Sequence, residues 1–277
     1  MNINDFELLN RVSSIINTES DGNDAAVARY IIQHLRHAGA ITVSDIMEQA
    51  YVTRSAVRRF CNRMGYQSLS DLKESFSQIV FPSDLRHREP SLDFAAYRAE
   101  LDVGMIEMFA DIEGRVADDT ITTLADEIAR RKSVEIMCAN NVTGNLQRFQ
   151  QEMFYAGKII RITSGDDIAL HAGNGSLTDS LLIVVSISGL FAVQVSRYVA
   201  LRTARKLLVT AFCNDATTHE FDEVYYLSDK GNGIDRLGMY SKYAVTYFFD
   251  LLSANYLTRY ADASDAPLYG PSQVWSE

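Results

Sequence analysis

The chain has 277 residues, 47% of them hydrophobic, with a formal net charge of −10. This length is too great for one small domain and suits two, and the hydrophobic content is enough to fill two cores. The acidity excludes a protein that coats nucleic acid with its whole surface, so any contact with DNA must come from a local basic patch.

The chain begins with two amphipathic stretches. Apolar residues recur at helical spacing from Ile3 to Ile16 and again from Asp24 to His37. We expect these two helices to complete a helical bundle together with the stretch that follows them.

That next stretch, Ile41 to Phe76, predicts a helix-turn-helix with one further helix. Thr42 can cap the first helix, with Asp45 three residues later to close a capping box. The helix should end near Ala50, and Tyr51 and Val52 should form a tight turn. The second helix then starts at Thr53 or Ser55, and Gly65 should stop it as a left-handed residue.

The second helix divides into two faces on a helical wheel. Val57, Phe60 and Met64 fall on one side and can pack inward. Arginine fits guanine edges and phosphate oxygens, asparagine can pair with adenine, and serine and threonine can hold phosphates. An ordinary solvated, arginine-rich face is the alternative. The candidate DNA-binding residues, with Arg63 at the rim, are Thr53, Arg54, Ser55, Arg58, Arg59, Asn62 and Arg63.

A polar segment bracketed by Pro82 and Pro90 predicts a linker. We therefore expect a DNA-binding domain at 1–80, a linker at 81–90, a second domain at 91–262 and a flexible tail at 263–277. The second domain should open with a helix from Ser91 to Ile112, which carries Phe94, Leu101, Met105 and Phe109, followed by a helix from Asp118 to Arg131.

From Ser133 onward, short apolar runs alternate with helical segments. Near-continuous apolar strands separated by helices predict a parallel sheet that is covered on both faces. The expected fold is therefore an all-α bundle followed by a flavodoxin-like, three-layer α/β sandwich with a five-stranded parallel sheet. A long helix from Ile234 to Tyr260 should be the last element of the α/β domain. The five predicted strands are VEIMCA, KIIRIT, SLLIVVS, KLLVTAF and EVYYL.

The cysteines and the apolar runs indicate the cellular compartment of the protein. Cys61, Cys138 and Cys213 lie far apart without a CxxC pair, so neither a disulfide framework nor a zinc site is expected. No apolar stretch approaches the roughly 20 residues of a membrane span, and no signal peptide is recognisable. These features predict reduced thiols and a cytoplasmic protein without membrane contact.

Taken together, the two halves resemble the RpiR-type bacterial transcriptional regulators, which join a helix-turn-helix domain to a sugar isomerase (SIS) domain. The similarity extends from about Phe6 to Tyr260, and its most specific parts are VTRSAVRRFCNRMGYQSLSDLK and IVVSISG. In the first of these, Arg59-Phe60 and Gly65-Tyr66 match the family's pattern. The resemblance implies a SIS-like domain that binds an effector and forms oligomers.

The resemblance also implies an anion site for a sugar phosphate after the first and third strands. Ser186, Ser188 and Gly189 match the family's Ser-x-Ser-Gly, but Phe191 stands where a hydroxyl is usual. The loop after the first strand lacks the family's glycines and serine. Asn141 or Thr143 could supply a polar group there. Three alternatives stay open: a sugar phosphate, a different small molecule, and a pocket that has lost its effector.

The resulting prediction is a DNA-binding regulator of carbohydrate-related genes that is modulated by a small molecule. It would bind a palindromic operator as a homodimer or tetramer. No catalytic residue, metal site or cofactor is expected. The alternatives are a SIS-type sugar-phosphate isomerase, a ligand-free regulator with a degenerate pocket, and a helix-turn-helix that contacts another protein.

Overall fold

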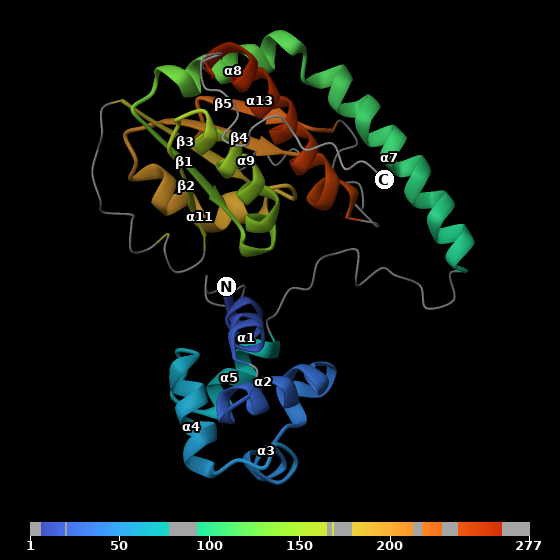
Figure 1. Cartoon of the computed structure of the whole chain (residues 1–277), viewed down its shortest axis with the longest axis vertical. Coiled ribbons are helices and arrows are strands. Elements are labelled where there is room, and N and C mark those ends of the chain that lie inside the picture. Colours follow the sequence, from blue (N-terminus) through green and yellow to red (C-terminus); the bar gives the residue numbers. More distant parts are fainter. Residues whose placement is uncertain are drawn as a thin grey trace, which may run out of the picture. The chain divides into compact units, whose positions relative to one another are not determined.

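The computed structural model describes residues 7–19, 21–77, 93–164, 168, 179–212, 218–228 and 238–261. The chain divides into two compact units (Figure 1). The first comprises residues 1–82 with 165–167, and the second comprises 83–164 with 168–277. Each unit has its own buried core. The predicted linker at 81–90 and tail at 263–277 lie outside the described residues.

The described part of the N-terminal unit is helical. Its core gathers apolar side chains from every helix, including Val12, Ile31, Ile46, Phe60 and Leu72, all of them fully buried. The predicted helical bundle is thus confirmed. Its elements are α1 (Glu7–Thr18), α2 (Asn23–Gln33), the 3₁₀ helix η2 (Leu35–Ala40), α3 (Val43–Gln49), α4 (Arg54–Arg63) and α5 (Leu69–Ser77).

The second helix is shorter than predicted, because it ends at Gln33 and not at His37. The residue after the helix, His34, leaves the helical range with φ −108° and ψ 15°. Its ring stacks on the Tyr30 ring at 4.2 Å between centroids, and its Nδ1 lies 2.8 Å from the Tyr30 carbonyl oxygen. The chain then continues as η2.

The second unit contains the predicted five-stranded sheet. All neighbouring strands are parallel, and their order is β2-β1-β3-β4-β5. This is the strand order of flavodoxin-like folds, so the predicted fold class is confirmed. The strands are β1 (Ser133–Cys138), β2 (Ile160–Thr163), β3 (Ser180–Val185), β4 (Arg205–Thr210) and β5 (Glu223–Tyr226).

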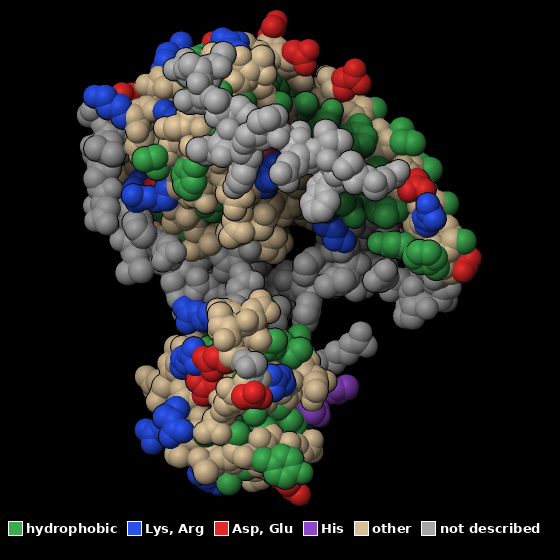
Figure 2. All heavy atoms as spheres, in the orientation of Figure 1, with side chains coloured by type: hydrophobic (Ala, Val, Ile, Leu, Met, Phe, Trp, Pro, Cys, Tyr) green, Lys and Arg blue, Asp and Glu red, His purple; other side chains and the backbone are tan. Residues whose placement is uncertain are grey.

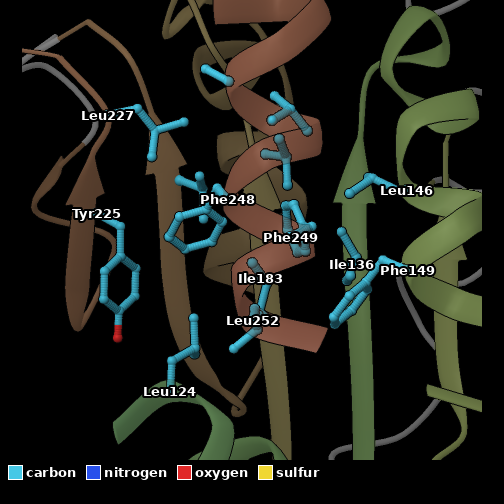
Figure 3. Packing of buried hydrophobic residues seen from close by; sticks show 14 of the residues in the cluster. Leu124, Ile136, Leu146, Phe149, Ile183, Tyr225, Leu227, Phe248, Phe249 and Leu252 are labelled. Carbon is cyan, nitrogen blue, oxygen red and sulfur yellow. The ribbon is translucent and has the colours of Figure 1, made fainter. Parts of the chain in front are cut away.

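Helices cover both faces of the sheet. On one face, Ile183 of β3 packs among α8 (Asp118–Arg130), α9 (Thr143–Tyr155) and α13 (Val245–Tyr260), and Figure 3 shows Phe248 and Phe249 of α13 over the strands. On the opposite face, Val184 packs under α11 (Leu190–Ala200). Strands buried on both faces must be apolar at every position, which explains the uninterrupted SLLIVV of β3.

The predicted long last helix has a different first turn. It begins as a π-helix at Tyr240–Ala244 and continues as α13. The carbonyl oxygen of Lys242 accepts hydrogen bonds from Asn145 Nδ2 of α9 at 2.9 Å and from Thr246 Oγ1 at 3.2 Å. A long-range contact therefore helps to hold the widened turn. The local sequence does not predict this turn.

The second unit opens with the long helix α7 (Phe94–Arg115), which has 22 residues. Figure 1 shows α7 (green) extending along the unit, with its first turns reaching beyond the other elements of that unit. Only Met108 and Ile112 of this helix are buried. None of the helices in the described residues is long and apolar enough to cross a membrane.

Candidate DNA-binding surface and effector site

The helix-turn-helix begins with a well-formed cap. Thr42 Oγ1 accepts a hydrogen bond from the backbone N–H of Asp45 at 3.1 Å, and the Thr42 N–H donates to Asp45 Oδ2 at 2.9 Å. These bonds form the predicted capping box. Hydrogen bonds from Thr42 also hold the pKa of Asp45 below its ordinary value. The first orphan N–H groups of α3 are satisfied in this way, and the start of the motif is fixed.

The turn between α3 and α4 carries an exposed aromatic residue under backbone strain. Tyr51 has φ +54° and its side chain is 91% exposed, whereas the neighbouring Val52 is buried. Thr53 then caps α4, because its Oγ1 accepts from the N–H of Ala56 at 3.2 Å. Of the two predicted start residues, Thr53 is the N-cap, and its hydroxyl also lies 2.9 Å from that of Ser55.

The two predicted faces of α4 are found in the structure. Val57, Phe60 and Met64 are buried in the core of the N-terminal unit. No described residue forms an ion pair with the three outward arginines at 54, 58 and 59. In Figure 2, Lys and Arg side chains (blue) lie along the side of this unit that α4 forms in Figure 1. The exposed candidate residues are Thr53, Arg54, Ser55, Arg58, Arg59, Asn62 and Arg63.

Arg63 differs from the other candidates because its guanidinium is already paired. Its Nη1 lies 2.6 Å from Glu19 Oε1 and 2.8 Å from Asp24 Oδ2. The hydrogen bonds that Arg63 donates to Asp24 and Glu19 raise the pKa of its guanidinium. Arg63 therefore ties the end of α4 to α2 and the residue that follows α1, and it lies at the rim of the arginine face.

The end of α4 is fixed by a Schellman motif, as Gly65 predicted. Gly65 has φ +85°, its N–H donates to the Asn62 carbonyl at 3.0 Å, and the Tyr66 N–H donates to the Cys61 carbonyl at 2.9 Å. Arg11 Nη1 donates to the carbonyl of Met64 at 3.0 Å. Both ends of α4 are thus anchored, so its outward side chains are presented from a rigid support.

In the second unit, the loops after β1 and β3 leave the sheet side by side, because Cys138 pairs with Val185. Ser186 is 3% exposed, and its Oγ accepts from the N–H of Ala192 at 3.0 Å. The Ser186 side chain therefore satisfies a backbone N–H group in the first turn of α11. Ser188 is exposed, and Gly189 is the N-cap of α11 with φ +75°.

The loop after β1 brings its polar residues to the same edge. Asn141 is exposed, and Thr143 is the first residue of α9, with its Oγ1 3.7 Å from Cys138 Sγ. Burial raises the pKa of Cys138 to about 11, so its thiol remains protonated and is a poor nucleophile at neutral pH. The starts of α9 and α11 thus flank the point where strand order reverses, which is where α/β sheets bind ligands.

Sequence reasoning missed two features of these surfaces. The sequence predicts only a turn at Tyr51, although its exposure next to the start of α4 makes it a candidate DNA contact. No motif in the sequence marks Asn145, which joins α9 to the π-helix. Phe191, which stands where a hydroxyl is usual, packs partly buried against the hydrophobic cluster beneath α11. Within the described residues, no group of three His, Cys, Asp or Glu side chains could hold a metal ion.

The N-terminal unit therefore belongs to the class of helix-turn-helix domains. Residues 7–80 match the family described as "Helix-turn-helix domain, rpiR family". This part of the chain is a helix-turn-helix domain of the rpiR family. A search of the curated proteins found no significant match.

Several solved structures match this chain at low sequence identity. The Vibrio vulnificus NanR protein complexed with ManNAc-6P is 16% identical, with a TM-score of 0.47 over 91% of this chain and 92% of its own. The sugar isomerase domain of an RpiR transcription factor from Sphaerobacter thermophilus is 15% identical, with a TM-score of 0.48 over 59% and 90%. The c3406 protein of E. coli CFT073 is 11% identical, with a TM-score of 0.49 over 63% and 97%.

Proposed function

We propose that this protein is a cytoplasmic, DNA-binding transcriptional regulator of carbohydrate-related genes and that α4 is its recognition helix. The observation that carries the proposal is the outward face of α4, with three arginines that no described residue pairs, in a domain of the rpiR family. A recognition helix places its N-terminal residues in the major groove. Arg54, Ser55 and Arg58 lie in the first turns of α4, where base contacts are expected.

The remaining candidates have supporting roles in this proposal. Thr53 and Asn62 lie at the two ends of the exposed face, where phosphate contacts would fix the helix in the groove. Arg63 remains at the rim, paired with its carboxylates. The protein would act as a homodimer or tetramer, because two related copies can read the two half-sites of a palindromic operator.

The second unit would bind the small-molecule effector at the carboxyl edge of the sheet. Free N–H groups at a helix start, together with the positive end of the helix dipole, favour an anion, and the starts of α9 and α11 both lie at this edge. Gly189, Ser188, Asn141 and Thr143 would line the site, while Ser186 would support it as a cap. Phosphosugars are the first class of effector to test. Effector binding would alter the affinity for DNA only if two conformations of the protein bind the effector with different affinities.

The DNA assignment is tested by the double variant Arg58→Ala with Arg59→Ala. Both side chains are exposed, so the helical content and melting temperature should stay unchanged. Gel shifts with genomic fragments captured by the wild-type protein should lose the retarded band. A variant that still binds those fragments as tightly as the wild type would refute the assignment of α4.

The effector assignment is tested by thermal-shift measurements of the full chain with a panel of phosphosugars. We expect at least one to stabilise the second unit without being converted, because the protein is proposed to sense the compound and not to transform it. Turnover of the stabilising compound, followed by product analysis, would support the isomerase instead.

A further inference from the structure

The outer side of α7 carries a stripe of small and apolar residues that the described structure leaves uncovered. Val103 is 56% exposed and Ile106 is 69% exposed, values far above those of residues in a core. Figure 2 shows hydrophobic side chains (green) at the surface along α7, among acidic ones (red). We define the seam by its spacing of three and four residues: Ala96, Ala99, Val103, Ile106, Ala110 and Gly114, all exposed.

Most of the seam lies on the side of α7 opposite to the packed one, and its last two residues, Ala110 and Gly114, border a groove of the same unit. The packed side of the helix is marked by Met108 and Ile112, and by Gly104, where an added Cβ would lie 3.4 Å from Met239. Residues spaced alternately by three and four share one face of a helix and form the seam of helix pairs. Because the packed side is already occupied, the seam is a second, independent apolar face.

The start of α7 adds a second observation. Phe94 is 75% exposed, and the first turns of the helix extend beyond the rest of the unit (Figure 1). These first turns, here called the arm, therefore present apolar surface that the rest of the unit leaves exposed.

We propose that the seam is the dimerisation surface of the protein and that its occupant is α7 of a second copy, packed antiparallel. The seam is self-complementary in this arrangement. If Val103 of one copy lies opposite Ile106 of the other, the larger residues meet at the centre and Ala99 meets Ala110 on each side. This is an isologous contact, in which the same surface serves both copies.

The same register brings the start of the second copy's α7 next to a groove. The groove has a volume of about 620 Å³ and is formed by the end of α7, Thr120 of α8 and strand β5. Its walls include Ala110 and Gly114 of the seam, together with Arg115. The acidic N-cap of the second copy's α7, Asp93, would come level with Arg115, a contact of opposite charges.

The area of the seam explains why the groove is needed. A helix of 22 residues is roughly 33 Å long and about 10 Å wide. The seam alone therefore falls short of the roughly 800 Å² per partner that stable dimers bury. The projecting arm and the groove provide further area on each side of the two-fold axis.

The contact is tested by sedimentation of the full chain with Val103→Asp and Ile106→Asp combined. Both residues are exposed in the single chain, so folding should be retained, as circular dichroism would verify. The dimer dissociation constant should rise at least about 100-fold, because the apolar centre is lost from both copies. Ile159→Asp is the matched control, since Ile159 is 77% exposed in the same unit but lies outside the seam.

The register is tested with single cysteines at positions 103 and 106. A disulfide forms only when the two Cβ atoms approach to about 4.5 Å or less. Mixing Val103→Cys with Ile106→Cys should give a cross-linked dimer under mild oxidation, whereas each variant alone should give little. Cross-linking of each variant with itself would overturn the antiparallel register. A monomeric wild type, or a seam variant as dimeric as the control, would overturn the whole proposal.

This inference builds on the proposed function, because a palindromic operator calls for two copies, but the two fail in different ways. Sedimentation is measured without DNA. If only the seam is wrong, Arg58→Ala with Arg59→Ala still abolishes DNA binding while the seam variant remains a dimer. If only the DNA assignment is wrong, the seam variant becomes monomeric while the arginine variant binds DNA like the wild type.

Discussion

Arg58 and Arg63 lie five residues apart on α4, and the structure predicts that their loss has different consequences. Arg58 is exposed and no described residue pairs with it, whereas Arg63 is bound to Glu19 and Asp24. A base contact contributes about 1–3 kcal/mol, so Arg58→Ala should cost about 2–6 kcal/mol over two half-sites. Arg63→Ala removes no base contact and should change operator affinity by about 1 kcal/mol or less.

The assay is a fluorescence titration of a labelled operator at several salt concentrations. If Arg58 contacts a phosphate instead of a base, the slope of log K against log salt should fall by about 0.9 per half-site, or about 1.8 for the dimer. Arg63→Ala should leave this slope unchanged. An Arg63 variant that loses as much affinity as the Arg58 variant would refute the reasoning, because the carboxylate pairing would then not keep Arg63 out of the interface.

Three further predictions concern the architecture that supports α4. Gly65→Ala should destabilise the N-terminal unit by about 1–2 kcal/mol in urea unfolding, because alanine is strained at φ +85° and its Cβ would lie 3.0 Å from Arg11 Nη1; an unchanged midpoint would contradict the Schellman assignment. Tyr51→Gly should stabilise the same unit by about 1 kcal/mol in thermal melts, since glycine adopts positive φ without strain and the exposed ring loses no packing. Thr42→Ala should raise the pKa of Asp45 toward its ordinary value in an NMR titration. The stability contributed by the lowered pKa is present above the ordinary value and lost as pH falls, so this variant should lose stability chiefly at neutral pH.

The parts of the fold that local interactions determine were predictable from the sequence. The cap at Thr42, the two faces of α4 and the stop at Gly65 each depend on residues within a few positions of one another. The parallel sheet was also predictable, because strands covered on both faces must be apolar throughout. The sequence therefore identified both the helix-turn-helix and the α/β unit.

The features that were not predictable depend on contacts between distant segments. The π-helix before α13 is held by Asn145, about a hundred residues earlier in the chain. The apolar residues of α7 could be recognised, but not which of them would be covered. Leu101 and Met105 pack against the core while Phe94 is 75% exposed. Only the position of the helix on its unit separates the packed side from the seam.

The candidate effector site was predictable only in part. The motif after β3 was recognisable, and the structure brings it next to the loop after β1. The direction of the Ser186 hydroxyl was not predictable, because a serine at a strand end can face a ligand or the helix that follows. In this chain it accepts a hydrogen bond from Ala192, so Ser188 and Gly189 become the more direct candidates for ligand contact.

The claim that α4 reads DNA is tested most directly by selection from random duplexes with the purified full chain. Wild-type protein should enrich two half-sites related by two-fold symmetry, about one helical turn apart. The combined change of Arg54, Arg58 and Arg59 to alanine should abolish that enrichment while the fold is retained. A wild type that enriches no sequence, or a triple variant that enriches the same sites, would contradict the account.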